Sequence, residues 1–237
     1  MDPDAFRTPA DVPVPAVTAD EMRGVDRVAV EEFGLALLSM MENAGRTLAA
    51  HARELRAGPV TVLAGSGGNG GGGLACARHL ANRDVPVSVV LDRPPADLEG
   101  AAARQHGVLA EMEVPVGIGP DALDDSELVV DALVGYGLQG PLRGPAADLV
   151  TAANRVDSGT LSLDVPSGRD ATSGAEPGVA VDPDYVLTLA LPKTGLVGLD
   201  AALSLADISI PAAVYDRLDL GHERLFDDAY AVGLREC

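Results

Sequence analysis

The sequence is poor in positive charge, in cysteine and in long apolar runs. Its 237 residues contain 17 Lys and Arg against 36 Asp and Glu, which gives a formal net charge of −19. Without a basic surface to collect phosphate groups, nucleic acid and anionic membranes are disfavoured as partners. Two cysteines, Cys76 and Cys237, do not make a disulfide scaffold. No uncharged apolar run approaches the roughly 20 residues of a membrane-spanning helix, so we expect a cytoplasmic protein.

Lysine is nearly absent, because 16 of the 17 basic residues are arginine and the remaining one is Lys193. An acidic chain with so little lysine suggests a high-salt cytoplasm, in which the repulsion between surface charges is screened. This composition concerns the habitat of the protein and not its activity.

Short apolar runs and helical stretches alternate over most of the chain. The first 17 residues are acidic and rich in proline, and we expect a flexible arm over residues 1–17. Thr18 and Glu21 then have the spacing of a capping box, which predicts the start of a helix. Residues 18–237 contain no internal repeat and no linker, so they are predicted to form a single domain. Strands are expected at 60–64, 85–91, 128–133, 161–165, 185–191 and 205–210, and helices at about 35–55, 74–83, 98–110 and 146–156.

Strands that are apolar along their whole length and separated by helices favour an α/β fold with a mostly parallel sheet between helical layers. In such a sheet, ligands bind beyond the carboxyl ends of the strands. Four unusual loops follow strand ends, at 65–73 (GSGGNGGGG), 135–141 (GYGLQGP), 166–168 (PSG) and 192–195 (PKTG). We therefore expect these four loops to form one site.

The glycine stretch 65–73 lies between a predicted strand and a predicted helix. Glycine allows a positive φ and a close approach to a ligand, and a helix N-terminus offers free N–H groups to an anion. A dinucleotide or phosphate ligand is therefore expected, although the stretch is not a P-loop, since no Lys-Ser/Thr follows it. An acidic partner for a ribose is expected about 20 residues further on, near Asp92. A flexible turn without a ligand is the alternative.

Five motifs occur in a characteristic order, at 41–45 (MENAG), 65–80 (GSGGNGGGGLACARHL), 131–137 (DALVGYG), 164–168 (DVPSG) and 191–196 (LPKTGL). Together they make the sequence resemble the NAD(P)H-hydrate epimerase family, also called the YjeF N-terminal domain family, over about residues 18–215. The resemblance implies a Rossmann-like three-layer α/β/α sandwich that is usually a homodimer. It also implies an isomerase that interconverts the R and S forms of hydrated NADH and NADPH, written NAD(P)HX, which a separate dehydratase then repairs. One K⁺ ion per subunit is expected beside the substrate.

The resemblance further assigns residues to the site. Asn69, Asp131 and Ser167 match the family's potassium ligands, and their oxygen atoms suit a weakly bound monovalent cation. Asp164 matches the acidic residue that contacts the substrate. The residues that match the two substrate-binding loops are Gly68, Asn69, Gly70, Gly71 and Gly72 in the first and Gly135, Tyr136, Gly137, Leu138, Gln139, Gly140 and Pro141 in the second.

Epimerisation at C6 of a hydrated nicotinamide needs a proton donor for the leaving hydroxyl, a base for the incoming water, and negative charge near the cation between them. We assign the proton transfer to Asp164, assisted by Lys193, which we expect to contact the substrate or Asp164. A turn-capping role is the alternative for Asp164. Asp131 ends an apolar strand, where an unpaired carboxylate is costly, so a functional role is favoured there.

Two departures from the family's glycine loop, which usually reads GPGNNGGDG, matter for the site. Gly68 stands in place of the first Asn and Gly72 in place of the Asp. Both changes leave only backbone where the family has a polar side chain. A catalytically impaired nucleotide-binding module is therefore an alternative to the enzyme. NAD-dependent oxidoreduction is a third hypothesis, which rests on analogy with other glycine loops alone.

Overall fold

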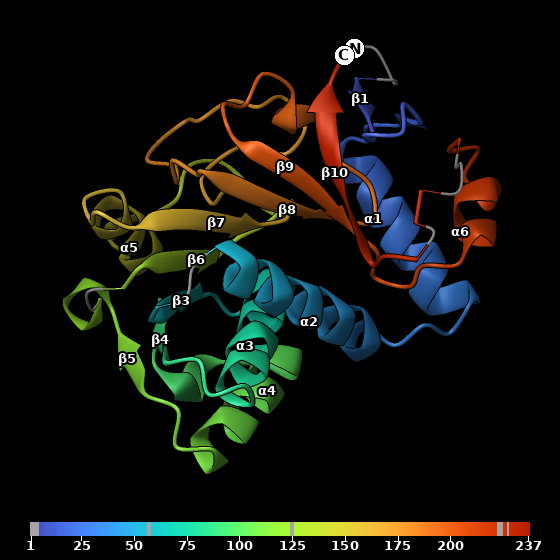
Figure 1. Ribbon diagram of the computed structural model, residues 1–237. Helices are drawn as coiled ribbons and strands as arrows, with labels where there is room; N and C mark the ends of the chain where they lie inside the picture. Colours follow the sequence, from blue (N-terminus) through green and yellow to red (C-terminus); the bar gives the residue numbers. More distant parts are fainter. Residues whose placement is uncertain (1–4, 56–57, 124–125, 222–224, 227) are drawn as a thin grey trace.

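A ten-stranded sheet forms the middle layer of the computed structural model, which describes residues 5–55, 58–123, 126–221, 225–226 and 228–237 (Figure 1). Its strands are β1 (Phe6–Arg7), β2 (Pro13–Val14), β3 (Val60–Ala64), β4 (Val87–Leu91), β5 (Val116–Ile118), β6 (Leu128–Ala132), β7 (Gly159–Leu163), β8 (Tyr185–Leu189), β9 (Ala202–Ala206) and β10 (Ala231–Glu236). They lie in the order β2-β1-β10-β9-β8-β7-β6-β3-β4-β5. Strands β3 to β9 pair in parallel, whereas β10, β1 and β2 add an antiparallel edge. The predicted mostly parallel sheet is confirmed.

Helices cover both faces of this sheet. They are α1 (Ala19–Arg27), α2 (Leu37–Leu55), α3 (Gly68–Ala81), α4 (Gly100–Glu111), α5 (Pro145–Ala153) and α6 (Ala212–Arg217). Helices α2, α3 and α4 pack on one face, where Val60 and Val62 of β3 belong to their core cluster. On the opposite face, Leu149 of α5 packs in a cluster with Leu63 and Val129. The result is the three-layer α/β/α sandwich that the resemblance implies (Figure 1).

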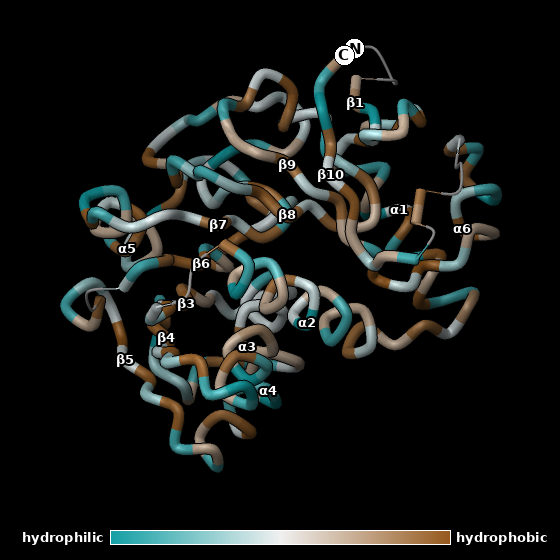
Figure 2. The backbone as a smooth tube through the Cα atoms, in the orientation of Figure 1, coloured by the Kyte–Doolittle hydropathy of each residue, from teal (hydrophilic) through white to brown (hydrophobic). Residues whose placement is uncertain are grey.

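The inner strands follow the prediction because their residues are buried on both faces. All five residues of β3 and of β6 are buried, and hydrophobic colours follow β6 and β8 in Figure 2. Strand β3 has the predicted bounds, whereas β7 ends two residues early, because Asp164 has a φ of +69° and leaves the extended conformation. Strand β9 likewise ends at Ala206, ahead of Ser209 with its φ of +66°, and not at residue 210.

The prediction of a flexible arm is wrong for residues 5–17. Strand β1 pairs with β10, and β2 pairs with β1. This pairing buries Phe6 and Val14 completely, and the apolar area that they remove from water favours the ordered conformation. Val17 forms a parallel bridge with Lys193, so the same segment reaches the predicted site. Strands β1 and β2 thus belong to the same sheet as the predicted domain. Residues 1–4 of the predicted arm lie outside the described residues.

Helix α1 begins at the predicted capping box and continues into an unexpected π-helical turn. The Thr18 hydroxyl accepts the N–H of Glu21 at 3.2 Å, and the Glu21 carboxylate accepts the N–H of Thr18 at 2.7 Å. Residues Val28–Glu32 are π-helical, and Gly34, with a φ of +70°, separates them from α2. Such turns occur frequently at functional sites, and this one borders the cavity described below.

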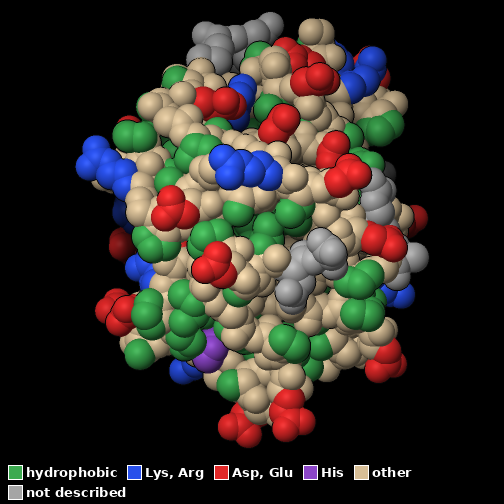
Figure 3. Space-filling view, turned by 90° about the vertical axis from the view of Figure 1, so that its left-hand side faces the viewer, with side chains coloured by type: hydrophobic (Ala, Val, Ile, Leu, Met, Phe, Trp, Pro, Cys, Tyr) green, Lys and Arg blue, Asp and Glu red, His purple; other side chains and the backbone are tan. Residues whose placement is uncertain are grey.

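The surface reflects the unusual composition. On the face shown in Figure 3, the basic side chains stand apart from one another among acidic and apolar ones. The helices of the described ranges are all too short or too polar to cross a membrane. Exposed apolar side chains include Val30, Phe33 and Leu37, which lie in or next to the π-helical turn. Val30 and Leu37 also line the cavity described below.

Candidate functional site

A cavity of about 730 Å³ lies at the carboxyl ends of the parallel strands. The strand order changes direction at β3, because β4 follows on one side and β6 returns to the other. Crevices form at such a switch point, where the loops that leave neighbouring strands diverge. The loops after β3, β6 and β8 line the cavity together with Asp164, α1, the π-helical turn and the start of α2. Three of the four predicted loops therefore meet at this cavity. The fourth, 166–168, does not contribute to its lining.

The glycine stretch enters the cavity as a turn and then becomes helical. Helix α3 begins at Gly68, six residues before the predicted start. None of the glycines in 65–73 has a positive φ, so conformational freedom does not explain them. Close packing does: a Cβ on Gly70 would lie 1.8 Å from the carbonyl oxygen of Gly65. Tertiary packing thus overrides the low helix propensity of glycine.

The N-terminus of α3 opens into the cavity. No side chain caps the helix at Gly67, and Ser66, Gly67, Gly68 and Asn69 line this corner. The first amide groups of a helix lack partners within it and carry the positive end of its dipole. We call residues 66–69 the anion corner, because such a helix end suits a phosphate or another anion.

The two predicted substrate loops contribute to the cavity only in part. The residues that line it are Gly68, Asn69 and Gly72 of the first loop and Gly135, Tyr136 and Gly137 of the second. Gly70 and Gly71 are buried within α3 and do not line the cavity. The rest of the second loop, Leu138, Gln139, Gly140 and Pro141, lies outside the lining, with Gln139 and Gly140 exposed.

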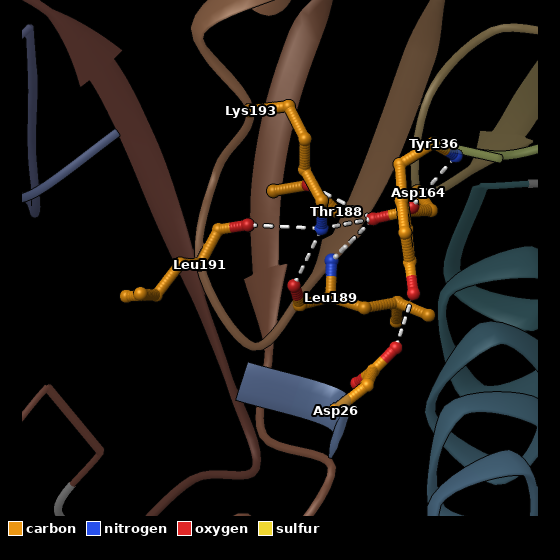
Figure 4. A network of polar contacts seen from close by, with 7 residues as sticks. All are labelled: Asp26, Tyr136, Asp164, Thr188, Leu189, Leu191 and Lys193. Carbon is orange, nitrogen blue, oxygen red and sulfur yellow. Dashed lines mark hydrogen bonds and ion pairs between the residues drawn. The ribbon is translucent and has the colours of Figure 1, made fainter. Parts of the chain in front are cut away.

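At the floor of the cavity, Asp164 and Lys193 form a buried ion pair (Figure 4). Their side chains are 4% and 1% exposed, respectively. Lys193 Nζ also donates to the carbonyl oxygens of Leu189 at 2.8 Å and Leu191 at 3.0 Å. Because an ammonium has three hydrogens, all of its donors are engaged. Of the two predicted contacts, substrate or Asp164, Lys193 makes the second.

The Asp164 carboxylate is fixed by the backbone around it. Its own φ of +69° is unusual for a residue other than glycine, and such strain is typical of functional sites. The Oδ1 atom, which bonds Lys193, also accepts the N–H of Leu189 at 3.2 Å. Among the described residues, Oδ2 accepts the N–H of Tyr136 at 3.3 Å. The second oxygen therefore keeps lone pairs for a ligand in the cavity.

Asp26, on α1, is a cavity residue that no sequence pattern indicated. Its carboxylate accepts a hydrogen bond from the hydroxyl of Tyr136 (Figure 4). Burial raises the pKa of Asp26 above its usual value, and the hydrogen bond from Tyr136 only partly opposes this shift. Burial and the adjacent Asp26 also raise the pKa of Tyr136, so the phenol stays protonated at neutral pH. In the sequence, Asp26 looks like an ordinary solvent-exposed acidic residue of an amphipathic helix. No local pattern therefore marks it as a cavity residue.

Two of the three predicted potassium ligands lie together beneath the cavity. Asp131 is fully buried and accepts four hydrogen bonds, from Ser167 Oγ at 2.6 Å, Ser167 N at 2.8 Å, Ser162 Oγ at 2.9 Å and Leu133 N at 3.3 Å. Burial raises the pKa of Asp131 despite these bonds. The third predicted ligand, Asn69, has a buried Nδ2 without a partner. Within the described ranges, no three His, Cys, Asp or Glu side chains are grouped to hold a metal ion.

Asp92, the predicted ribose partner, lines the cavity directly after β4. Its carboxylate accepts two hydrogen bonds from the guanidinium of Arg93, both of 2.9 Å. The Asp92 side chain is 7% exposed and that of Arg93 is 41% exposed, so the arginine can still reach a ligand. An acidic residue at this place in a βαβ unit binds ribose hydroxyls in dinucleotide-binding folds, and a nearby arginine accommodates a 2′-phosphate.

Comparison with known proteins identifies the family. The family model for the YjeF-related protein N-terminus matches residues 37–195. The chain belongs to this family. Among its relatives, an NAD(P)H-hydrate epimerase from Dehalogenimonas lykanthroporepellens is 42% identical over 229 residues, which cover 92% of each chain.

Other relatives of this YjeF N-terminus protein are longer. A bifunctional NAD(P)H-hydrate repair enzyme Nnr from Salinibacter ruber is 38% identical over 86% of this chain, which matches 42% of that protein. The chain thus spans less than half of that relative. The crystal structure of yeast ynu0, YNL200c, superposes with a TM-score of 0.80 at 22% identity and covers 93% of this chain and 100% of the yeast chain. That likeness concerns the fold.

The two departures from the YjeF N-terminus loop lie in different surroundings. Gly68 is at the cavity wall, and a Cβ there would lie 3.3 Å from Met41 Cε. A Cβ on Gly72 would lie 2.9 Å from Leu163 Cδ2. Leu163 therefore occupies space in which the side chain of an Asp at position 72 would begin. Compared with the family's usual loop, the anion corner lacks one polar side chain, at Gly68, and the cavity lining lacks a second, at Gly72. The floor of the cavity retains Asp164 and Lys193 of the family motifs.

Proposed function

We propose that this chain is an isomerase that interconverts the R and S forms of hydrated NADH and NADPH. The relative from Dehalogenimonas, alike over nearly its whole length, carries the name NAD(P)H-hydrate epimerase. The observation that carries the proposal is the buried Asp164–Lys193 pair on the floor of a cavity large enough for a nucleotide. Binding without turnover is not favoured, because relatives that match most of this chain are named NAD(P)H-hydrate epimerases.

The reaction inverts one carbon of the hydrated ring. The lone pair of the ring nitrogen expels the C6 hydroxyl, which takes up a proton and leaves as water, so that the C6–O bond breaks. Water then attacks C6 from the other face, loses a proton, and returns the electron pair to nitrogen. Both steps pass through a cation, which a nearby carboxylate stabilises. In this proposal Asp164 Oδ2 faces the ring and transfers a proton.

Lys193 is a positioning residue in this scheme. Its three hydrogens are held by Asp164, Leu189 and Leu191, which leaves none for the substrate. The ammonium instead fixes the Asp164 carboxylate and balances its charge inside the protein, where an unpaired charge is costly. The anion corner at the start of α3 would hold a phosphate of the dinucleotide.

One K⁺ ion per subunit is part of the proposal. Asn69, Asp131 and Ser167 offer oxygen atoms, which are the donors that such a cation prefers. The buried Nδ2 of Asn69 lacks a partner, and an amide turned over would present an oxygen at that position. The Asp131 carboxylate already accepts four hydrogen bonds, so a cation would replace the longest, from Leu133 N. Bound K⁺ would supply positive charge that holds the loops after β3 and β6 together.

We also propose a cytoplasmic homodimer that works beside a dehydratase. Support for a dimer comes from the exposed Phe33 and Leu37 next to the cavity, since apolar side chains gathered on a surface mark contact sites. Support for the dehydratase comes from relatives named bifunctional repair enzymes. Light scattering tests the dimer, and a mass of about 24 kDa would contradict it.

The test of the activity uses purified R and S hydrates, with interconversion followed by chromatography. Wild-type protein is expected to accelerate interconversion in both directions, and Asp164→Asn to lose at least a hundredfold in rate, as removal of a general acid–base group does. The matched control is Asp148→Asn, on the exposed side of α5. A wild-type rate equal to the spontaneous one would refute the proposed function.

A further inference from the structure

Tyr136 contacts two carboxylates, one through its backbone and one at the far end of its side chain (Figure 4). Its backbone N–H donates to Asp164 Oδ2 at 3.3 Å, and its hydroxyl donates to Asp26 Oδ2. Its ring lies beside the Lys193 ammonium, with Nζ 5.7 Å from the ring centroid. All four groups line the cavity. Elements that are far apart in sequence, α1 and the ends of β6, β7 and β8, thus bring two acids to one tyrosine.

The two acids differ in their surroundings. Asp164 is paired with the Lys193 ammonium and bonded to backbone N–H groups. Asp26 forms no ion pair within the described residues, and its contact is the neutral phenol of Tyr136. Burial raises the pKa of Asp26, and the charge of Asp164 adds to the shift, while that of Lys193 opposes it. Two acids held in such different environments are typical of an acid and a base that act in one reaction.

The proposed reaction needs two proton transfers on opposite faces of one ring carbon. A single carboxylate on one wall serves one face. We propose that Asp26 is the second proton-transfer residue of the cavity, with the Tyr136 hydroxyl as the relay between Asp26 and the C6 oxygen. This inference rests on the proposed function. It assigns a catalytic role to the contact between α1 and the loop after β6.

The proton balance closes without another reactant. In this step the Tyr136 hydroxyl turns its hydrogen from Asp26 to the C6 oxygen and accepts the proton of protonated Asp26 in its place. The C6 oxygen takes up the tyrosine proton as the C6–O bond breaks, and water leaves. A water molecule on the other face bonds to C6 and gives a proton to Asp164. Exchange with solvent at the cavity mouth returns both acids to their starting states. In the opposite direction the two acids exchange roles, as a reversible epimerisation requires.

A purely structural role for Asp26 gives a different expectation. The Tyr136 hydrogen bond would then only hold α1 against the sheet, and its loss would lower stability without changing the rate per folded molecule. Asp26→Asn separates the two roles, because the amide oxygen still accepts the Tyr136 hydroxyl but the side chain carries no exchangeable acid proton. Tyr136→Phe keeps the ring and removes the relay.

The decisive measurement is kcat and KM for each hydrate, from pH 5 to 9, together with the unfolding temperature. For Asp26→Asn we expect kcat to fall at least a hundredfold, with KM within threefold and the unfolding temperature within 3 °C. For Tyr136→Phe we expect kcat to fall at least tenfold. Asp20→Asn, the same exchange at an exposed position of α1, is the control and should match wild type.

The pH profile supplies a second readout. In the direction in which protonated Asp26 is the acid, the wild-type rate should fall as pH rises through the pKa of Asp26, and this limb should be missing in Asp26→Asn. The groups that face Asp26 and shape the limb are Tyr136, Asp164, Lys193 and, from α6, Tyr215. Asp164 is present in both proteins and so cannot account for the difference between them.

Each outcome decides the matter. A kcat for Asp26→Asn within threefold of wild type, with an unchanged pH profile, would overturn the inference, as would a loss explained wholly by unfolded protein. If Asp26→Asn does not fold, Tyr136→Phe decides alone, and an unchanged kcat there refutes the relay. If the wild type does not accelerate interconversion, the proposed function is refuted. If the wild type is active and Asp26→Asn is equally active, only the role of Asp26 is refuted.

Discussion

At the scale of single residues, the floor of the cavity tolerates few amino-acid substitutions. Lys193 reaches three acceptors at once, Asp164 Oδ1 and the carbonyl oxygens of Leu189 and Leu191. A compact ammonium on a flexible stem can do so, whereas a planar guanidinium spreads its donors over a wider fork. This explains why one lysine persists in a chain that otherwise uses arginine.

Lys193→Arg should fold but epimerise at least tenfold more slowly, because the wider head group displaces the Asp164 carboxylate. A tenfold change corresponds to about 1.4 kcal/mol in the activation free energy. Steady-state kinetics with circular dichroism check the expectation, and Arg155→Lys, an exchange at an exposed position, is the control. Wild-type kinetics in Lys193→Arg would show that the exact position of Asp164 is unimportant.

Arg93 should discriminate between the two hydrates. It pairs with Asp92 at the end of β4 and keeps 41% of its side chain exposed. In Arg93→Ala we expect KM for hydrated NADPH to rise about tenfold more than KM for hydrated NADH, because a hydrogen bond to a charged group contributes roughly 1.5–3 kcal/mol. Parallel KM measurements with both substrates decide, and an equal rise for both would contradict a contact with the 2′-phosphate.

The predictability of the site differs from residue to residue for a physical reason. Asp164 and Lys193 stand at strand ends, where a parallel sheet collects its functional groups, so position in the pattern marks them. Asp26 depends on the folding of α1 over the loop that contains Tyr136, a contact that no local spacing encodes. Gly70 and Gly71, predicted to bind substrate, are packed inside α3 and do not line the cavity. Packing inside a helix and contact with a ligand both favour glycine, so the sequence does not distinguish the two roles.

At the scale of elements, the contact between α2 and α3 governs the position of the anion corner. A Cβ on Gly45 would lie 2.5 Å from Ala75 Cβ and 2.7 Å from the carbonyl oxygen of Gly72, so the two helices touch with almost no side chain between them. Glu42 adds polar contacts across the same seam, with a 2.8 Å hydrogen bond between Oε1 and His79 Nε2. The MENAG motif is thus a helix-packing motif.

Gly45→Ala should destabilise the protein by about 3 kcal/mol, the upper part of the range for overpacking, because the new methyl group pushes α3 away from α2. Gly24→Ala is the matched control: position 24 lies within α1, and a Cβ there would meet nothing within 4 Å. The control should be neutral or stabilising by up to about 1 kcal/mol. Urea denaturation measures both, and equal stabilities would refute the close contact.

The sequence pattern predicts strands that are buried on both faces, but it does not predict strands whose pairing partners are distant in the chain. The inner strands read as apolar runs, so β3 is predicted to the residue. Strands β1, β2 and β10 are short or half-exposed, and their pairing joins the two ends of the chain, which periodicity does not register. The start of α3 was missed because glycine disfavours helix in isolation, and only the packing against α2 and the sheet reverses this.

At the scale of the whole molecule, a net charge of −19 favours the binding of cations and opposes compactness. Raising the salt concentration should stabilise the fold through screening, whatever the cation. A specific potassium site would add to this general effect, because a ligand that binds only the folded state raises its stability.

The unfolding temperature should therefore be higher in KCl than in choline chloride at equal ionic strength. At a K⁺ concentration ten times the dissociation constant, the difference should be roughly 3–6 °C for a protein of this size. Asn69→Ala should abolish the difference and keep the value in choline chloride. Thermal scans of both proteins measure it, and equal temperatures in the two salts would rule out the site.

The pairing of β1 with β10 affects how this protein is made in the cell. Phe6 finds its partner Glu236 only after the roughly 230 residues between them have left the ribosome. At about 5–20 residues per second, the N-terminal segment waits roughly 10–50 s while the inner sheet forms. During that interval Phe6 and Val14, completely buried at the end, stay in water. The segment thus reaches its native contacts later than the inner strands that are synthesised after it, and a chaperone that binds nascent chains has its opportunity there.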